Sequence, residues 1–360
     1  MFAQVIRPFA CVLVAFATSF AFLAPSLADE KNGPIVVDRT FVEQAIARGA
    51  VIWDVRSAND YAKGHLPGAV SIGDAPKVLR DEVREDFIDL DQVVKALAAA
   101  GIEPSREVVV YGSRGGWPAY FGQYTLQVFG AQQVSVYHNG FEDWFDAGRA
   151  SSVMAVALEN AANLRKLGTL SADLSSRYAL DRSRLVDTRD MLARLNQNWV
   201  QLIDVRTPNE FIGQDIRAIR GGHIPGAINI PYEQNWQDPQ AAGKLAKKQA
   251  SSNIGMQLKD RESLKALYAK LDPRKETVVY CQSGARASLT AGVLQELGFK
   301  QVRVYDSSWL GYAAQLDAPA NHASFVNVGA LNARIGSLQS RIEQLEAERT
   351  AAKALQTAAQ

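Results

Sequence analysis

Short apolar, β-branched runs alternate along the chain with longer stretches in which apolar residues recur at helical spacing. The runs Val108-Val109-Val110-Tyr111 and Thr277-Val278-Val279-Tyr280 have the length and composition of buried strands. Each is followed by a helical stretch that ends at Phe129-Gly130 or Leu297-Gly298, where glycine suits the left-handed conformation found just after a helix. Strands that alternate with amphipathic helices predict βα units and an α/β fold, with a mainly parallel sheet covered on both faces.

The whole pattern occurs twice, and the length of 360 residues fits two domains. We predict one domain at 33–150 and a second at 185–318, joined by residues 151–184 as a surface linker, because that stretch has no clean period. The paired segments are Trp53-Asp54-Val55-Arg56 with Ile203-Asp204-Val205-Arg206, Gly64-His65-Leu66-Pro67-Gly68-Ala69 with Gly222-His223-Ile224-Pro225-Gly226-Ala227, and Val134–Tyr137 with Val302–Tyr305.

Residues 1–28 have the organisation of an export signal. Arg7 is followed by an apolar run over Phe9–Leu23, and the small residues Ser26 and Ala28 occupy the positions that a signal peptidase requires. We therefore expect cleavage after Ala28 and a periplasmic location, with the signal as the chain's one association with a membrane. An uncleaved anchor helix is the alternative, but the run is short for a bilayer span and is interrupted by polar residues.

The tail at 328–360 differs from both repeats. Its apolar residues follow the four-and-three spacing of a coiled-coil seam, which is typical of a helix that packs on another helix. A homodimer through residues 331–352 is one interpretation, and packing on the same chain is the other. The seam consists of Leu331, Ile335, Leu338, Ile342 and Leu345, with Arg349 as an interruption and Ala352 as a weak continuation.

The amino-acid composition excludes some classes of protein. Hydrophobic residues make up 47% and charged residues 21%, which excludes a disordered chain, and 39 basic residues against 38 acidic ones argue against a nucleic-acid binder. The chain has two cysteines, and cleavage of the signal removes Cys11. Cys281 is then alone, so it forms no internal disulfide and is either a small buried hydrophobe or a reactive thiol.

The segment after Tyr280 favours the reactive thiol. A strand leads into Cys281, a loop with Gly284 follows, and a helix is expected to begin near Ala287. A loop of this kind places the sulfur in a cup of backbone N–H groups at a helix N-terminus, an arrangement that binds anions. The N–H groups and the guanidinium of Arg286 should stabilise the thiolate, and Gly284 permits the sharp turn.

Taken together, these motifs resemble the rhodanese family of sulfurtransferases. The resemblance rests on the two Asp-Val-Arg segments, the two Gly-His-x-Pro-Gly-Ala segments, the loop from Cys281 to Arg286 and the closing Tyr305-Asp306-Ser307-Ser308-Trp309. It implies two rhodanese-like domains. Gly112 stands where the second copy has Cys281, so the first domain is expected to be inactive. The implied nucleophile is Cys281, and the implied substrate-binding residues are Gln282, Ser283, Gly284, Ala285 and Arg286.

The resemblance further implies that Cys281 takes the outer sulfur of a small anionic donor such as thiosulfate. A persulfide then forms, and cyanide or a thiol removes its sulfur, with no metal or organic cofactor. A periplasmic sulfur carrier without turnover is an alternative, and so is a mercaptopyruvate sulfurtransferase, because Ser283-Gly284 also occurs in that type. Cysteine-dependent phosphatases and related arsenate reductases rank lower, since their arginine stands one position further from the cysteine than Arg286 does.

The other conspicuous residues have structural interpretations. The Asp-Arg pairs should tie loops together, and the two histidines should anchor the turns that follow them. Ser113 has no base nearby in the sequence, so a second active site is not expected in the first domain. The tryptophans Trp117, Trp144 and Trp309 are expected to pack in the core or between the domains.

Overall fold

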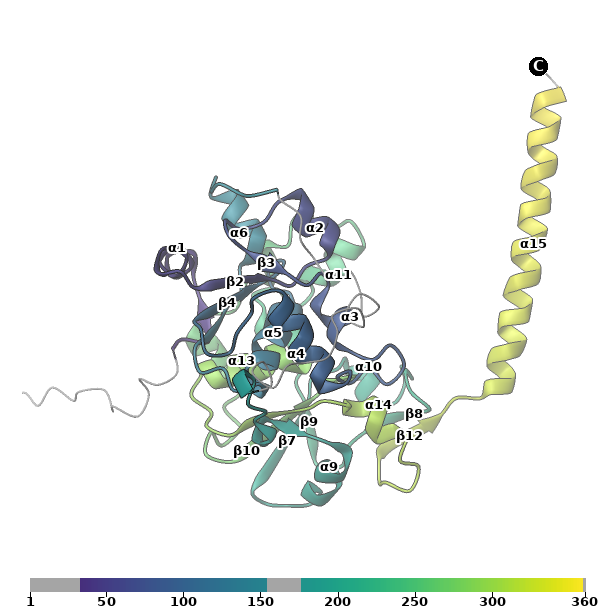
Figure 1. The fold of residues 1–360 in the computed structure, drawn as a ribbon. Helices are drawn as coiled ribbons and strands as arrows, with labels where there is room; N and C mark the ends of the chain where they lie inside the picture. The colour runs from purple at the N-terminus through teal and green to yellow at the C-terminus, as the bar shows by residue number, and fades with distance from the viewer. Residues whose placement is uncertain (1–32, 154–175, 359–360) are drawn as a thin grey trace, which may run out of the picture.

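The computed structural model describes residues 33–153 and 176–358, so the expected signal peptide and most of the expected linker lie outside the described residues. Two five-stranded sheets have the same strand order, β1-β5-β4-β2-β3 and β6-β11-β10-β7-β9, and every pairing within them is parallel. The predicted α/β repeat is therefore confirmed (Figure 1). The strands of the first sheet are β1 Val36–Val37, β2 Val51–Asp54, β3 Val70–Ser71, β4 Val108–Tyr111 and β5 Val134–Tyr137, and those of the second are β6 Leu185–Val186, β7 Val200–Asp204, β9 Ala227–Asn229, β10 Glu276–Tyr280 and β11 Val302–Tyr305.

Helices cover both faces of each sheet. In the first half, side chains of β4 alternate between two apolar clusters, so that Val108 and Val110 face α3, α4 and α5 while Val109 and Tyr111 face α1, α2 and α6. Such alternation buries both sides of a parallel strand. The helices are α1 Arg39–Arg48, α2 Ala58–Lys63, α3 Ala75–Leu79, α4 Leu90–Ala99, α5 Trp117–Val128 and α6 Gly140–Asp146.

The second half repeats this arrangement. Val278 and Tyr280 of β10 pack with α9 and α14, whereas Val279 and the residue after the strand, Cys281, face α12 and α13. Its helices are α9 Thr188–Arg194, α10 Pro208–Phe211, α11 Ala241–Ala246, α12 Arg261–Leu267, α13 Ala287–Glu296 and α14 Ser308–Ala313, and its 3-10 turns are η1 Arg182–Arg184, η2 Tyr232–Asn235 and η3 Ile254–Met256.

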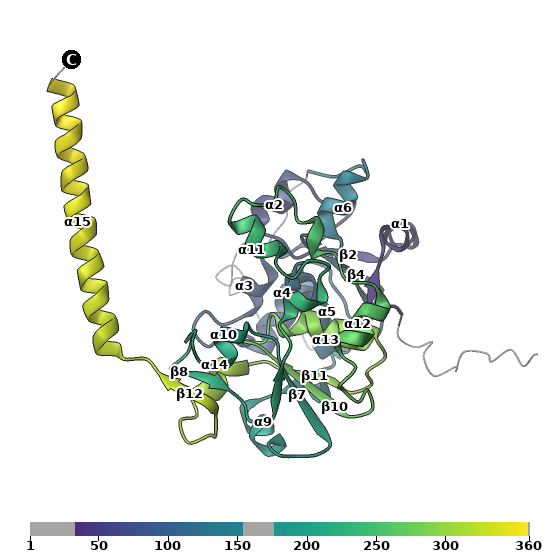
Figure 2. The same cartoon turned by 180° about the vertical axis from the view of Figure 1, so that it is seen from behind.

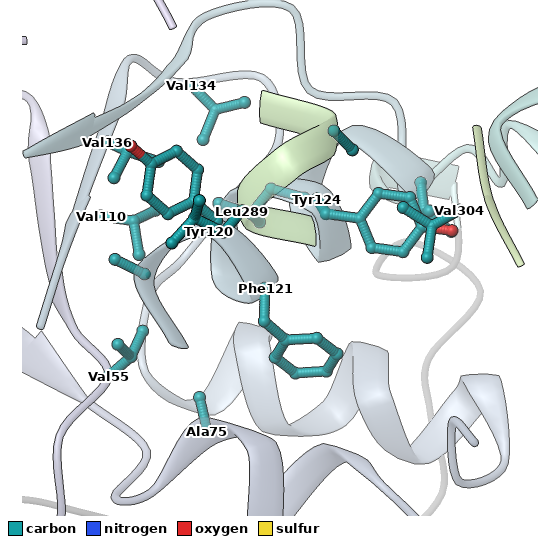
Figure 3. Packing of buried hydrophobic residues seen from close by; sticks show 14 of the residues in the cluster. Val55, Ala75, Val110, Tyr120, Phe121, Tyr124, Val134, Val136, Leu289 and Val304 are labelled. Carbon is teal, nitrogen blue, oxygen red and sulfur yellow. The ribbon is translucent and has the colours of Figure 1, made fainter. Parts of the chain in front are cut away.

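The two halves share one apolar core. A single cluster of buried side chains runs from the inner face of the first sheet to the inner face of the second, and α5 packs directly on α13 at its centre. Figure 3 shows part of this cluster, with Tyr120 and Phe121 of α5, Val110 of β4 and Leu289 of α13. At Gly292 of α13 an added Cβ would lie 2.6 Å from the ring of Tyr120, so the two helices meet at close approach.

Residues beyond the second sheet extend the body and then leave it. Strand β12 Asn321–Phe325 pairs antiparallel with β8 Arg220–His223, so the second half continues past residue 318. Helix α15 Val328–Ala358 then projects away from the body in both views (Figures 1 and 2). Among the described residues, no helix combines the length and apolar character needed to span a bilayer.

The predicted surface linker is wrong near its C-terminal end. Tyr178 is 4% exposed, its hydroxyl donates to the carbonyl of Ile102 at 2.6 Å, and its ring packs edge-on against Phe129. The sequence around Tyr178 has no periodic partner, so a single aromatic anchor could not be distinguished from an ordinary loop residue. The chain between the halves is therefore fixed to the first domain before it enters β6.

Candidate active site

Cys281 lies at the carboxyl end of β10, on the face of the sheet that meets the first half. Its side chain is 1% exposed and belongs to the shared core. Its backbone N–H donates to Oγ of Ser308 at 3.1 Å, and its carbonyl accepts from the N–H of Trp309 at 3.1 Å. Neighbouring turns therefore hold the cysteine backbone on both sides.

The loop after Cys281 forms the cup that the sequence predicts. Gly284 has φ +80°, and a Cβ at this position would lie 2.4 Å from the carbonyl oxygen of Asp306, so the loop requires glycine. Helix α13 begins at Ala287. Within the described residues, no backbone N–H from Gln282 to Arg286 donates a hydrogen bond to protein. These donors and the N-terminus of α13 remain available to an anion.

Arg286 forms a buried ion pair that the sequence analysis did not identify. Its guanidinium contacts both carboxylate oxygens of Glu210, at 2.9 and 3.2 Å, and the Glu210 side chain is 2% exposed. Burial by itself raises the pKa of Glu210, but the bonds from Arg286 outweigh it and bring this pKa to about 2. The pKa of Arg286 moves in the opposite direction: burial lowers it, but the charge of Cys281 and the hydrogen bond and charge of Glu210 more than reverse this, so that both partners are held in their charged forms.

Glu210 is also held from its own side. It closes a capping box with Thr207 at the start of α10, with the N–H of Thr207 donating to the carboxylate at 3.0 Å. Arg217 approaches the same carboxylate at 3.4 Å. Two guanidinium groups thus share one carboxylate beside the loop.

A cleft of about 810 Å³ lies over the loop, between the two halves. Trp117, which the sequence analysis assigned to packing, is partly exposed and lines this cleft. The cleft is therefore a joint product of both halves. From the second half it is lined by Arg217, Gln282, Ser283, Ala285 and Arg286, and from the first half by Asp74, Pro76, Lys77, Arg80, Asp81, Glu82, Glu85 and Trp117.

The predicted site residues come together around this cleft. Gln282, Ser283, Ala285 and Arg286 line it, and Gly284 makes the turn between them. The amide nitrogen of Gln282 donates to the carbonyl of Arg217 at 2.8 Å, while its amide oxygen is buried and has no hydrogen-bond partner within the described part of the chain. Gln282 therefore holds the neighbouring Arg217 segment against the loop.

The first half has no equivalent cup. Gly112 replaces the cysteine, and the loop after it is covered by residues of the second half. Trp236 donates from Nε1 to the carbonyl of Gly115 at 3.2 Å, and a Cβ on Gly115 would lie 2.4 Å from Cβ of Met256. His138 completes this contact with a 2.9 Å hydrogen bond to the carbonyl of Met256. The first loop is thus a packing surface between the halves.

The Asp-Arg pairs and the two histidines make the structural contacts expected of them. Arg206 binds the carboxylate of Asp204 and donates to the carbonyl of Gly222 at 2.7 Å, and Arg56 does the same with Asp54 and Gly64. The histidines stack on aromatic rings of the preceding helices, His65 on Tyr61 of α2 and His223 on Phe211 of α10. Within the described ranges, no three His, Cys, Asp or Glu side chains form a group that could hold a metal ion.

The sequence matches a known domain family and several named proteins. The model of the rhodanese-like domain matches residues 38–147 and 187–315. The chain is 34% identical over 269 residues to the thiosulfate sulfurtransferase of Corynebacterium glutamicum, covering 72% of this chain and 80% of that one. It is 33% identical over 270 residues to a putative thiosulfate sulfurtransferase of Mycolicibacterium smegmatis, covering 72% and 86%.

Among solved structures, the fold resembles the 3-mercaptopyruvate sulfotransferase SseA of Escherichia coli, with a TM-score of 0.60, 23% identity and coverage of 77% of this chain and 99% of that one. It also resembles the wild-type structure of EanB, with a TM-score of 0.61, 20% identity and coverage of 81% and 69%. These two likenesses concern the fold alone. With the family model matching both halves and the duplicated sheet found in each, the chain belongs to the family of proteins built from rhodanese-like domains.

Proposed function

We propose that the protein is a sulfurtransferase that moves sulfane sulfur from thiosulfate, or a similar anionic donor, to cyanide or a thiol. The observation that carries this proposal is Cys281 at the base of a loop whose N–H groups are available to an anion. Residues 185–318 supply this site, and residues 33–150 form the inactive copy. The relatives named thiosulfate sulfurtransferase support the choice of donor.

The reaction follows from this geometry. The Cys281 thiolate attacks the outer sulfur of thiosulfate, a new S–S bond forms, and sulfite leaves with the electron pair of the broken S–S bond. The N–H groups of 282–286 and the guanidinium of Arg286 stabilise the anionic donor and the departing sulfite. An acceptor nucleophile then attacks the persulfide sulfur and releases the Cys281 thiolate.

Mass spectrometry after thiosulfate treatment tests the proposal. We expect the mass of one sulfur atom to be added to the peptide that contains Cys281, and to be lost when cyanide is supplied. The Cys281→Ser variant should take up no sulfur while retaining the circular dichroism spectrum and melting temperature of the native protein. Sulfur transfer by that variant would exclude the mechanism.

The same preparation separates the alternatives. Uptake of one sulfur without turnover toward any acceptor would indicate a carrier, and faster loading from 3-mercaptopyruvate than from thiosulfate would indicate the mercaptopyruvate type. Hydrolysis of p-nitrophenyl phosphate at a rate equal to thiosulfate turnover would favour phosphatase chemistry.

Export to the periplasm is part of the proposal. The charge, apolar run and small residues of 1–28 support cleavage after Ala28. Fractionation of the native host, followed by N-terminal sequencing, should find a periplasmic protein that begins at Asp29. A chain that keeps residues 1–28 in the membrane fraction would indicate an anchor instead.

We also propose a homodimer through residues 331–352. The seam side chains are between 44% and 55% exposed, with isoleucine at one seam position and leucine at the other, a combination that favours two strands. Light scattering should give a dimer for the native protein and a monomer for Leu338→Lys. Ser340→Lys, on the opposite face of α15, is the matched control and should remain dimeric; a monomeric native protein would exclude the dimer.

A further inference from the structure

Arg80, a residue of the inactive first half, reaches the loop of the candidate active site. It lies after α3 in the segment 73–87, is 7% exposed, and lines the cleft. Its Nη1 contacts a carboxylate oxygen of Asp306 at 2.8 Å, and its Nη2 donates to the backbone carbonyl of Ser283. One guanidinium therefore joins the active loop to the turn that packs against it.

The contact with Ser283 fixes the direction of a peptide unit. In a trans peptide the C=O and the following N–H point in opposite directions. Because the Ser283 carbonyl points at Arg80, the N–H of Gly284 points away from Arg80 and from the first half.

Several contacts hold the side chain of Arg80 in place. Its Nε donates to the carbonyl of Glu85 at 2.7 Å, and the guanidinium lies 5.6 and 5.3 Å from the ring centroids of Phe87 and Phe121. The second carboxylate oxygen of Asp306 accepts from the N–H of Phe87 at 3.0 Å. Since Asp306 neutralises the charge of Arg80, orientation of the loop is the effect that remains.

The loop of the first half is contacted by the corresponding segment of the second half, but with a different result. Each half places a segment that follows its outermost strand on the loop of the other half, 73–87 after β3 and 232–257 after β9. On the first loop this segment brings Met256 against Gly115 and closes the surface. On the second loop it brings Arg80, which binds the loop from one side and leaves the cleft open.

We propose that Arg80 is a positioning residue for sulfur transfer, which turns the Gly284 N–H into the cup around Cys281. The first half thus contributes to the chemistry of the second, and this inference rests on the proposed function. In this role Arg80 acts through the Ser283–Gly284 peptide, whose carbonyl it contacts.

The test compares four variants of the full chain. Arg80→Met combined with Asp306→Asn removes the contact without leaving a buried unpaired carboxylate, and Asp306→Asn alone measures the loss of the ion pair. Arg80→Lys keeps the charge, but its ammonium cannot bridge Ser283 and Asp306 as the planar fork does. Arg84→Met, an exposed arginine in the same segment, is the surface control.

We expect kcat/KM for thiosulfate to fall about 10- to 100-fold in the double variant and in Arg80→Lys, since one donor to the anion is misdirected. Asp306→Asn should lose less than the double variant, and Arg84→Met should match the native protein. If the double variant does not fold, Arg80→Lys decides. Native kcat/KM in a folded Arg80→Lys variant would overturn the proposal, because charge alone would then suffice.

A second readout does not depend on sulfur transfer. The rate at which iodoacetamide alkylates Cys281 should fall in the same variants, since the thiolate loses one N–H donor. If the native protein transfers no sulfur from any donor, the proposed function fails, while this rate still reports on the loop. An unchanged or faster alkylation rate in folded Arg80→Lys would overturn the role of Arg80.

Discussion

The Glu210–Arg286 pair gives the chain a stability that depends on acid pH. Glu210 is 1% exposed as a residue, and its pKa of about 2 compares with an ordinary value of 4.5. At ~1.4 kcal/mol per pKa unit, the lowered pKa of Glu210 corresponds to a contribution of roughly 3 kcal/mol to the free energy of unfolding. Solvent around the partly exposed Arg217 screens its interaction with Glu210 and reduces this contribution to about 2–3 kcal/mol. Glu210→Gln removes this contribution while keeping the size of the side chain.

The sign follows from the lowered pKa. A carboxylate whose pKa is lower in the folded state stabilises the fold above pH 4.5, and this stabilisation is lost as the pH falls toward 2. Urea unfolding of the native protein and of Glu210→Gln should therefore differ by about 2–3 kcal/mol at pH 7, and the difference should shrink steadily below pH 4.5. Carboxylates remote from Glu210 titrate equally in both proteins and cancel in the comparison, whereas Glu233, whose pKa the charge of Glu210 helps to raise, does not cancel fully. A difference that stays constant from pH 6 to pH 2.5 would refute this account of the pair.

Three further outcomes follow from the contacts. Arg286→Ala should raise KM for thiosulfate about 10- to 100-fold in steady-state assays, because the lost group is a charged donor to the anion. The alkylation rate of Cys281 should change less than KM does, and an unchanged KM would contradict the binding role of Arg286. Gly284→Ala should destabilise the fold by more than Gly298→Ala in urea titrations. Both glycines have positive φ, but only at Gly284 would the added Cβ press against Asp306. Equal losses of unfolding free energy, each about 1 kcal/mol, would show that the loop can shift to accept the Cβ. Burial lowers the pKa of His138 from 6.5 to about 4, so native stability should fall as the pH falls from 6.5 to 4, and His138→Gln should reduce that slope, while His223, whose pKa burial also lowers, retains part of it. An identical slope in the variant would assign it to other groups.

The sequence is sufficient where a local pattern specifies the structure. The Asp-Val-Arg segments and the strands that precede them recur in both halves, and the structure places Asp204 and Arg206 in the loop-tying role expected of them. Cys281 could be identified because it ends a strand and begins a glycine-containing loop. These signals lie within a few residues of one another.

The residues that were missed act across long separations. Glu210 lies 76 positions from Arg286, and its sequence signal, three residues after Thr207, is already explained by a helix cap. Arg80 lies 203 positions from Ser283, in a segment that carries several exposed charges. One sequence without related sequences contains no signal that pairs such positions, so the contacts become visible only in the folded chain.

The exchange of segments between the halves limits how the duplicated chain can change over generations. A copy without the nucleophile would ordinarily be free to accumulate substitutions. Here the segment 73–87 lies on the working loop, and the loop after Gly112 receives the segment 232–257 in return. A substitution in either segment therefore reaches the loop of the other half, and we expect a genetic screen for inactive alleles to find substitutions in both halves, with those of the first half gathered around Arg80.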